Sequence, residues 1–384
     1  MTIVNSDKKT LAEKVAGVID QALQEGKIVG TVTLISRNGK RIYSRAAGYA
    51  DREAGIAMQE DALFRLASLT KPIVSTAALA LIAQGTLQLD DPVTRWLPEF
   101  RPRLENGQEP TITVRQLLTH TAGLGYGFLE SEKGGPYARA GVSDGMDVVD
   151  FSLEENLIRL SSAPLKYMPG TAWGYSIATD VLGALLEKAY GAPLQNIVQD
   201  KVTGPLNMTE TSFFTTNRRK TTVPYLNTNS AAARMGDTEI AQVFEHTAGI
   251  RFQPERAFLP SAYPSGGAGM VGTAQDFLRF LEELRTGHRL LPKEWKDEMS
   301  RIQTGDLHLD GWPGRGFGLG FTVLRDPAAA ETKESPGTWR LGGAYGHSWF
   351  VDPAEKLTVV SLTNTAFEGM SGLFTAELTE SVYG

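Results

Sequence analysis

The chain of 384 residues contains no cysteine. This absence excludes disulfide bonds, metal sites with cysteine ligands and a cysteine nucleophile. It does not fix the cellular compartment, because exported proteins can also lack cysteine. Histidine is scarce as well, so a histidine-dependent site could draw on only five residues: His120, His246, His288, His308 and His347.

Positive charge is not in excess, and no apolar run is long. Lys and Arg number 38 against 44 Asp and Glu, a net charge of −6, which offers no basic surface for nucleic acid or a membrane. The longest apolar run, within residues 72–83, is too short to span a bilayer. The N-terminal sequence MTIVNSDKKTLAEKV lacks the pattern of a secretion signal. We therefore expect a cytoplasmic protein with no nucleic-acid or membrane partner; its oligomeric state is left open.

Both ends of the chain carry strand and helix patterns. Apolar residues between 11 and 23 recur at helical spacing, as in an amphipathic helix. Two stretches rich in β-branched residues, 29–36 and 41–48, flank Asn38-Gly39, a strong hairpin turn signal. Near the end, three strands and a final helix are predicted at 317–324, 345–352, 356–363 and 367–382.

The middle of the chain has mainly helical periodicity, interrupted by polar loops. We predict an α/β fold of the α+β type, in which strands from both ends form one antiparallel sheet of about five or more strands. The terminal helices would cover one face of that sheet. The α/β part is expected at about 8–75 and 305–384, with a mostly helical part at about 76–304, the whole of 1–384 forming one catalytic unit.

The first candidate for chemistry is the stretch FRLASLTKP, which places Ser68 three residues before Lys71. Pro72 is tolerated only in the first turn of a helix, so it sets the helix start close to Ser68. A helix N-terminus favours a developing negative charge, and a neutral lysine can take the proton of a serine hydroxyl. The alternative is structural: Ser68 caps the helix and Lys71 reaches water.

Two later stretches could complete a site with Ser68. Tyr175 lies in the turn GTAWGYS before another predicted helix, and alone it is as consistent with a half-buried structural tyrosine. The stretch RLGGAYGHSWFVD, residues 340–352, has two glycines at a strand, which allow close approach of a ligand to the backbone. A bulge or tight turn is the structural alternative.

Together and in order, these pieces resemble the serine β-lactamase and penicillin-binding-protein superfamily, whose pattern is S-x-x-K, then Y-x-N or Y-x-S, then K-T-G or a variant. LLTHTAGL (117–124) and PSGGAGM (264–270) resemble the class C branch. Within it, the motifs are similar to those of the family VIII carboxylesterases. The resemblance covers nearly the whole chain and implies a serine β-lactamase-like fold.

The resemblance also implies a mechanism without a metal or cofactor. Ser68 would attack a carboxylic ester, with Lys71 and Tyr175 moving the proton. The backbone N–H groups of Ser68 and Ala344 would form the oxyanion hole. The expected partner is a small-molecule ester.

Departures from the superfamily pattern bear on the substrate. Ile177 stands where an asparagine contacts β-lactams, and Leu341 stands at the position of the K-T-G lysine. Both weaken a β-lactamase function. An apolar cavity without a fixed cation would favour short, neutral esters. The candidates for substrate contacts are Tyr126, Trp173, Leu341, Gly343, His347 and Trp349, although core packing, and for His347 a structural hydrogen bond, are the alternatives.

A rival nucleophile is Ser143, within the G-x-S-x-G sequence Gly141-Val142-Ser143-Asp144-Gly145. That motif requires a strand before it and a helix directly after it, whereas its neighbours here are polar loop sequences. It would also require a histidine. Rival functions are acyl transfer from the same acyl-enzyme, weak β-lactam or D-peptide cleavage, and a catalytically silent member that only binds acyl groups or peptides.

Overall fold

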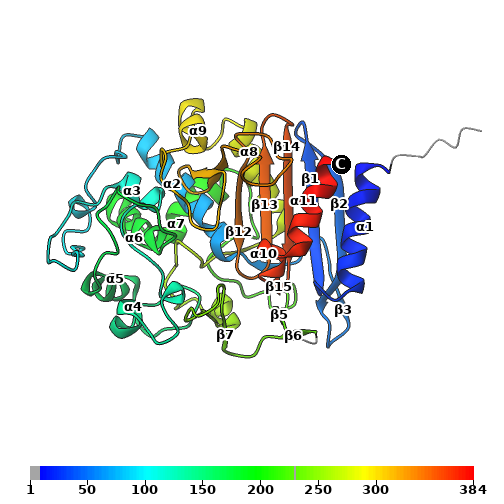
Figure 1. Cartoon of the computed structure of the whole chain (residues 1–384), viewed down its shortest axis with the longest axis horizontal. Helices are drawn as coiled ribbons and strands as arrows, with labels where there is room; N and C mark the ends of the chain where they lie inside the picture. Colours follow the sequence, from blue (N-terminus) through cyan, green and yellow to red (C-terminus); the bar gives the residue numbers. More distant parts are fainter. Residues whose placement is uncertain (1–8, 229–230) are drawn as a thin grey trace, which may run out of the picture.

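The computed structural model describes residues 9–228 and 231–384. Its main feature is an antiparallel sheet built from both ends of the chain (Figure 1). In spatial order its eight strands are β10 (Arg315–Phe317), β11 (Thr322–Leu324), β12 (Trp339–Gly343), β13 (His347–Asp352), β14 (Leu357–Thr363), β1 (Gly30–Arg37), β2 (Lys40–Asp51) and β3 (Ile56–Ala57). The predicted fold class is confirmed.

The N-terminal prediction of helix, strand, turn and strand is confirmed. Helix α1 (Leu11–Gln24) begins with a capping box between Thr10 and Glu13. Strands β1 and β2 pair through a turn in which Asn38 and Gly39 have φ of 54° and 75°. These positive angles match the right-handed twist of a hairpin and explain the Asn-Gly sequence.

The stretch 317–324, predicted as one strand, instead contains the last residue of β10, a turn at 318–321 and the short strand β11. Phe317 pairs with Thr322, and the Gly318 N–H donates to the Phe321 carbonyl oxygen at 2.8 Å. Gly320 has φ of 115°, a value that side chains disfavour. The glycines therefore fold back a sequence whose apolar residues alone resemble a continuous strand.

The predicted C-terminal helix is present but is divided by Gly372 into α10 (Glu368–Ser371) and α11 (Leu373–Tyr383). The Glu368 carboxylate accepts a hydrogen bond from the Phe374 N–H at 2.8 Å, so it caps the second helix. Helices α1 and α11 cover one face of the sheet, and α8 (Ala274–Thr286) packs against β1 and β14 from the other (Figure 1). Strands β1, β13 and β14 are consequently buried almost throughout.

The central region is less helical than predicted. Its helices, in chain order, are α2 (Thr70–Ala83), α3 (Val114–Leu118), α4 (Pro136–Ala140), α5 (Leu153–Ser162), α6 (Ala178–Tyr190), α7 (Leu194–Val198), α8 and α9 (Lys293–Ser300), with short turns at 67–69, 93–95, 127–129, 199–203 and 254–258. Seven short strands accompany them: β4 (Phe64–Arg65) pairs with β9 (Val271–Gly272), β7 (Glu239–Ala241) with β8 (Ile250–Phe252), and β5 (Tyr225–Asn227) lies between β6 (Ala232–Arg234) and β15 (Thr365–Ala366). Strands of two or three residues are too short to show the alternation of apolar and polar residues from which a strand is predicted.

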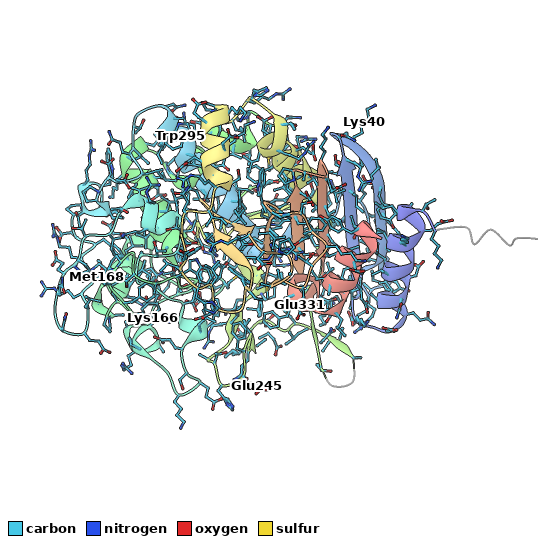
Figure 2. All side chains as sticks on the ribbon, turned by 45° about the horizontal axis from the view of Figure 1, so that its top comes forward. Lys40, Lys166, Met168, Glu245, Trp295 and Glu331 are labelled. Atoms are coloured by element: carbon cyan, nitrogen blue, oxygen red, sulfur yellow. The ribbon has the colours of Figure 1, made fainter. Side chains whose placement is uncertain are left out.

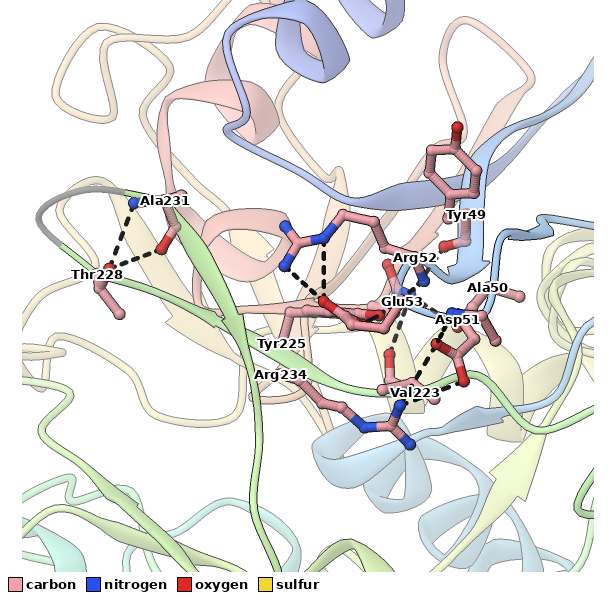
Figure 3. Close-up of polar contacts among 12 residues, drawn as sticks. Tyr49, Ala50, Asp51, Arg52, Glu53, Val223, Tyr225, Thr228, Ala231 and Arg234 are labelled. Carbon is pink, nitrogen blue, oxygen red and sulfur yellow. Dashed lines mark hydrogen bonds and ion pairs between the residues drawn. The ribbon is translucent and has the colours of Figure 1, made fainter.

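Hydrogen bonds link the small sheet of β5, β6 and β15 to the end of β2 (Figure 3). The Tyr225 hydroxyl donates to the Glu53 carboxylate and accepts from the Arg52 N–H, at 2.5 and 2.8 Å. The Asn364 amide donates to the carbonyl oxygens of Tyr49 and Val223, both at 3.0 Å. This network joins the central region to the main sheet.

Among the described residues, none of the helices has the length and apolar character needed to cross a membrane. The same residues contain no group of three or more His, Asp or Glu side chains arranged to hold a metal ion. The division of the chain into an α/β part and an inserted part stays a prediction.

Candidate active site

The local backbone presents Ser68 at the start of a buried helix, as predicted. Residues Ala67–Leu69 form a single 3₁₀ turn that runs into α2, and Pro72 lies within the first turn of that helix. Ala67 has φ of 47°. A non-glycine residue in this region costs about 1–3 kcal/mol, and such strain clusters at functional sites. The strained residue directly precedes the half-buried Ser68.

Two of the predicted side chains form hydrogen bonds with Ser68 Oγ. The Tyr175 hydroxyl donates to it at 2.7 Å, and Lys71 Nζ donates to it at 3.2 Å. Lys71 comes from the same helix one turn later, whereas Tyr175 arrives from the loop before α6. The structure thus brings together three residues from two separate sequence motifs.

Lys71 is held in place rather than extended to water, because its side chain is 1% exposed. Its Nζ also donates to the Gly267 carbonyl oxygen at 2.8 Å and lies 4.6 Å from the Tyr175 ring centre and 5.2 Å from that of Tyr126. A Cβ atom at Gly267 would lie 2.9 Å from the Tyr126 hydroxyl oxygen. Glycine at this position therefore allows the carbonyl to approach the amine.

Asp180 supports this arrangement from α6, and the sequence analysis missed it. One carboxylate oxygen accepts hydrogen bonds from the Gly267 N–H at 2.6 Å and the Ser265 hydroxyl at 2.8 Å. Burial raises the pKa of this carboxyl. Asp180 thereby fixes Gly267, the residue whose carbonyl faces Lys71. Its only sequence signal is a single aspartate inside an apolar helix.

His120 supports the tyrosine in a comparable way and was also missed. Its Nδ1 lies 3.0 Å from the Ser176 hydroxyl, and its carbonyl oxygen accepts from the Gly174 N–H at 3.0 Å. The imidazole packs against the Tyr175 ring with a centroid distance of 5.0 Å. Burial, and secondly the charge of Lys71, lower the pKa of His120, so the ring is neutral at ordinary pH. His120 thus fixes the residues on both sides of Tyr175.

Strand β12 brings the predicted oxyanion-hole residue to the same cavity. Ala344 follows the strand and lines the cavity together with Ser68. A Cβ atom at Gly343 would lie 2.7 Å from the Leu66 carbonyl oxygen, so glycine lets β12 approach the segment that carries the nucleophile. The Ala344 carbonyl oxygen accepts from the Phe367 N–H at 3.1 Å, which helps to fix the position of this residue.

Three of the predicted substrate contacts lie outside the cavity wall. Trp349 is fully buried and packs against Phe277 and Phe321, because side chains on β13 point alternately into the two cores. His347 is 1% exposed, and its Nε2 lies 2.7 Å from the Arg65 carbonyl oxygen, which is the structural alternative considered above. Gly343 lies instead against the Leu66 carbonyl oxygen, in the segment that carries Ser68. We therefore correct the expectation of direct substrate contact for these three.

The cavity itself has a volume of about 970 Å³ and contains Ser68 in its wall. Its apolar lining includes the predicted Tyr126, Trp173 and Leu341, and also Phe128, Leu129, Val243, Phe244, Ile250, Trp312 and Met370. Four cations line it as well: Lys166, Arg315, Lys333 and Arg340. The expectation of a cavity without a fixed cation is wrong. Figure 2 labels two lining residues, Lys166 from the central region and Glu331 from the loop before β12.

Ser143 has none of the features of a nucleophile elbow. It is 2% exposed and lies in the loop between α4 and α5. Its hydroxyl donates to the Asp147 carboxylate and accepts from the Tyr263 hydroxyl at 3.0 Å. These contacts give Ser143 a structural role in this loop.

Comparison with known proteins agrees with this geometry. Residues 15–383 match the protein family described as Beta-lactamase. The chain belongs to the β-lactamase family. It is 51% identical to Esterase EstB of Burkholderia gladioli over 383 residues, which cover 100% of this chain and 97% of that protein. The predicted family resemblance is confirmed.

Two further relatives extend the comparison of this β-lactamase-family chain. The solved structure of EstCE1, described as a hydrolase with promiscuous acyltransferase activity, superposes with a TM-score of 0.93 at 44% identity, covering 97% of this chain and 98% of that one. The acyltransferase calJ of Penicillium decumbens is 30% identical over 355 residues, which cover 86% of this chain and 79% of that protein. The chain therefore has the fold of a serine hydrolase, and its relatives include both esterases and acyltransferases.

Proposed function

We propose that this protein is a serine carboxylesterase that forms an acyl-enzyme on Ser68. The observation that carries the proposal is the convergence of Tyr175 and Lys71 on Ser68 Oγ, at 2.7 and 3.2 Å, in the wall of a large and mostly apolar cavity. Such a cavity suits the acyl and alcohol parts of a small ester. The names of the relatives support the same reaction class.

In the proposed mechanism, Ser68 Oγ attacks the ester carbonyl carbon while the Lys71 and Tyr175 pair takes its proton. The oxyanion that forms accepts hydrogen bonds from the backbone N–H groups of Ser68 and Ala344. Tyr175 returns the proton to the departing alcohol. Water then attacks the acyl-enzyme, gives its proton to the same pair, and releases the acid and free Ser68.

Substrates with short, neutral groups next to the ester bond fit the aromatic and aliphatic walls around Ser68. Leu341 and Ile177 replace the lysine and asparagine that recognise β-lactams in the superfamily pattern, so β-lactam and D-peptide cleavage are expected to be weak. A cytoplasmic location is part of this proposal and rests on the sequence alone.

The test is hydrolysis of p-nitrophenyl acetate, butyrate and octanoate, with nitrocefin in parallel. Wild type, Ser68→Ala and Ser143→Ala are compared. We expect ester turnover to be lost only in Ser68→Ala and nitrocefin turnover to be slow. Loss of turnover in Ser143→Ala alone would overturn the mechanism, and absence of labelling of Ser68 by a fluorophosphonate would indicate a silent binding protein.

Acyl transfer is the second candidate function. It is favoured by EstCE1, described as a hydrolase with promiscuous acyltransferase activity, and by the acyltransferase calJ. The same acyl-enzyme serves both reactions, and the incoming alcohol replaces water. Adding increasing butanol to p-nitrophenyl butyrate and measuring butyl butyrate against butyrate would separate the two.

A further inference from the structure

The cavity does not end near Ser68 but continues along β12 toward α11. Its lining includes Arg340 and Gly342, which share one face of β12 because alternate strand residues do, and Ala344, which directly follows the strand. Met370, Thr375 and Thr379 of α10 and α11 line it as well. We call this part the distal arm. At about 3.3 Å per strand residue, Arg340 begins roughly 13 Å from Ala344.

Glycine at position 342 keeps the distal arm open. A Cβ atom there would lie 2.5 Å from the Met370 side chain. Any larger residue would therefore close the gap between the strand and α10.

Two arginines lie at the far end of the distal arm, and one of them is less closely paired than the other. Arg315 and Arg340 share one carboxylate, Glu334, which is fully buried. Arg315 pairs closely with it, whereas Arg340 Nη2 lies 3.5 Å from it and donates to the Thr379 hydroxyl at 3.3 Å. A second buried carboxylate, Asp352, adds negative charge nearby and accepts from the Tyr383 hydroxyl at 2.8 Å, but Arg340 itself has only long contacts with its partners.

The guanidinium of Arg315 is also incompletely satisfied. Its side chain is 7% exposed, yet its Nη1 is buried and has no hydrogen-bond partner among the described residues. A buried charged donor without a partner is costly, so this arrangement favours a further acceptor nearby. Burial, and secondly the charge of Arg340, lower the pKa of Arg315. Glu334 Oε1 is likewise buried without a hydrogen-bond partner among the described residues, so these observations indicate a loosely satisfied arginine cluster and not an excess of charge.

Among the described residues, no charged group other than Glu334 forms an ion pair with Arg340. Lys333 and Glu380 form an ion pair with each other. Glu331 and Asp310 also line the cavity, but both are exposed to water, where their charge is screened. Arg340 is therefore the cation of the arm that is open to an incoming anion, because it lines the cavity, is 26% exposed and has only long contacts with its partners.

We propose that the distal arm is a second binding position, which takes a carboxylate carried at a distance from the ester bond that Ser68 cleaves. Arginine is suited to this because its planar guanidinium binds a carboxylate through two parallel hydrogen bonds. The carboxylate can belong to the acyl part or to the alcohol part of the ester. This inference rests on the proposed esterase function and refines its substrate class.

The first experiment compares matched substrates on the intact enzyme. One series has the carboxylate on the acyl side: mono-p-nitrophenyl glutarate, adipate and suberate. The other has it on the alcohol side: acetate esters of ω-hydroxy acids of the same lengths. Each compound is paired with its terminal primary amide, which has similar size and no charge. We expect kcat/KM for at least one carboxylate to exceed that of its amide at least tenfold at low salt, and the ratio to fall at 0.5 M NaCl.

Arg340→Gln tests the assignment, because Arg340 is the more accessible of the two arginines at 26% exposure. In Arg340→Gln, the ratio of kcat/KM for the carboxylate substrate to kcat/KM for its amide should fall to near one. Arg301→Gln is the matched control, since Arg301 is 59% exposed, is paired with Glu298 and is not part of the cavity lining. Its ratio should equal that of the wild type. A ratio near one in the wild type for both series, or one that survives Arg340→Gln, overturns the proposal.

A second measurement leaves every residue of the distal arm unsubstituted. Adipate dianion should bind the Ser68→Ala variant in calorimetry and compete with p-nitrophenyl butyrate in the wild type. Absence of adipate binding overturns the distal arm whether or not the enzyme hydrolyses esters. Ser68-dependent hydrolysis of p-nitrophenyl butyrate reports on the proposed function alone, so the two failures are distinguishable.

Discussion

The Tyr175 hydroxyl lies closer to Ser68 Oγ than Lys71 Nζ does, at 2.7 against 3.2 Å. Lys71 is meanwhile bound to the Gly267 carbonyl oxygen at 2.8 Å, whereas Tyr175 Oη is directed at the serine. The geometry suits a tyrosine that exchanges the proton directly with Ser68 and with the substrate oxygen. In the proposed mechanism, Lys71 would be the neighbouring group that stabilises the Tyr175 phenolate.

Tyr175→Phe removes only the hydroxyl that contacts Ser68. We expect kcat for p-nitrophenyl butyrate to fall by about 10²–10⁴, the usual contribution of a general acid–base group, while the melting temperature changes little. Tyr190→Phe is the control, because it removes an exposed hydroxyl that donates to Asp200 at 3.0 Å. Retention of wild-type kcat in Tyr175→Phe would assign proton transfer to Lys71 alone.

Asp180→Ala should disturb the carbonyl that holds Lys71. The Gly267 N–H would lose its acceptor, at a cost of about 1–3 kcal/mol in the free energy of unfolding. Because the effect reaches Ser68 through Lys71, we expect kcat to fall about tenfold or more with little change in KM. Asp180→Asn can still accept this hydrogen bond, so it should restore most of the activity. Equal losses in both variants would mean that the charge, not the hydrogen bond, is required.

Gly343→Ala should push β12 away from the nucleophile segment. Its Cβ atom would lie 2.7 Å from the Leu66 carbonyl oxygen, and backbone cannot move aside cheaply. We expect a loss of about 1–3 kcal/mol in stability and at least a tenfold loss in kcat, because Ala344 would be displaced from Ser68. Gly17→Ala in α1 meets nothing within 4 Å, so it should keep full activity and gain stability. Denaturant unfolding and ester kinetics on both variants provide the test.

His347 should make the protein sensitive to acid. Burial lowers its pKa from 6.5 to about 4, so between these values the unfolded chain binds a proton that the folded chain does not. The free energy of unfolding therefore falls as pH falls from about 6.5 to 4, by about 3 kcal/mol in total from this residue. His347→Gln should flatten the dependence measured by urea unfolding between pH 4.5 and 7.5. If the free energy of unfolding changes with pH to the same extent in wild type and His347→Gln, the assignment to His347 is contradicted.

The sequence predicted the parts of the site that depend on local rules. Pro72 indicated where the helix begins, and the three-residue spacing indicated that Lys71 shares a face with Ser68. The Asn38-Gly39 turn and the sheet formed from both chain ends followed from periodicity and turn chemistry. These features depend on near neighbours in the sequence, which a pattern can record.

The parts that the sequence did not predict depend on tertiary contacts. Asp180 and His120 act through the backbone groups of Gly267 and Gly174, and nothing in their own neighbourhood indicates this. Trp349 was expected in the cavity because it follows a glycine-rich stretch, but its position on β13 directs it into the core. The cations of the distal arm likewise come from separate strands that meet only in the folded sheet.

The position of β1 has a consequence for how the protein is made. This strand pairs with β14 on one edge and β2 on the other, so residues 30–37 and 357–363 are neighbours in the finished sheet. During synthesis, Ser68, Lys71 and Tyr175 emerge from the ribosome long before β14 exists. Contacts so distant in sequence form slowly, and exposed strand edges invite aggregation meanwhile. Folding of the nascent chain, and with it the onset of activity, should therefore wait for the last strands to be translated.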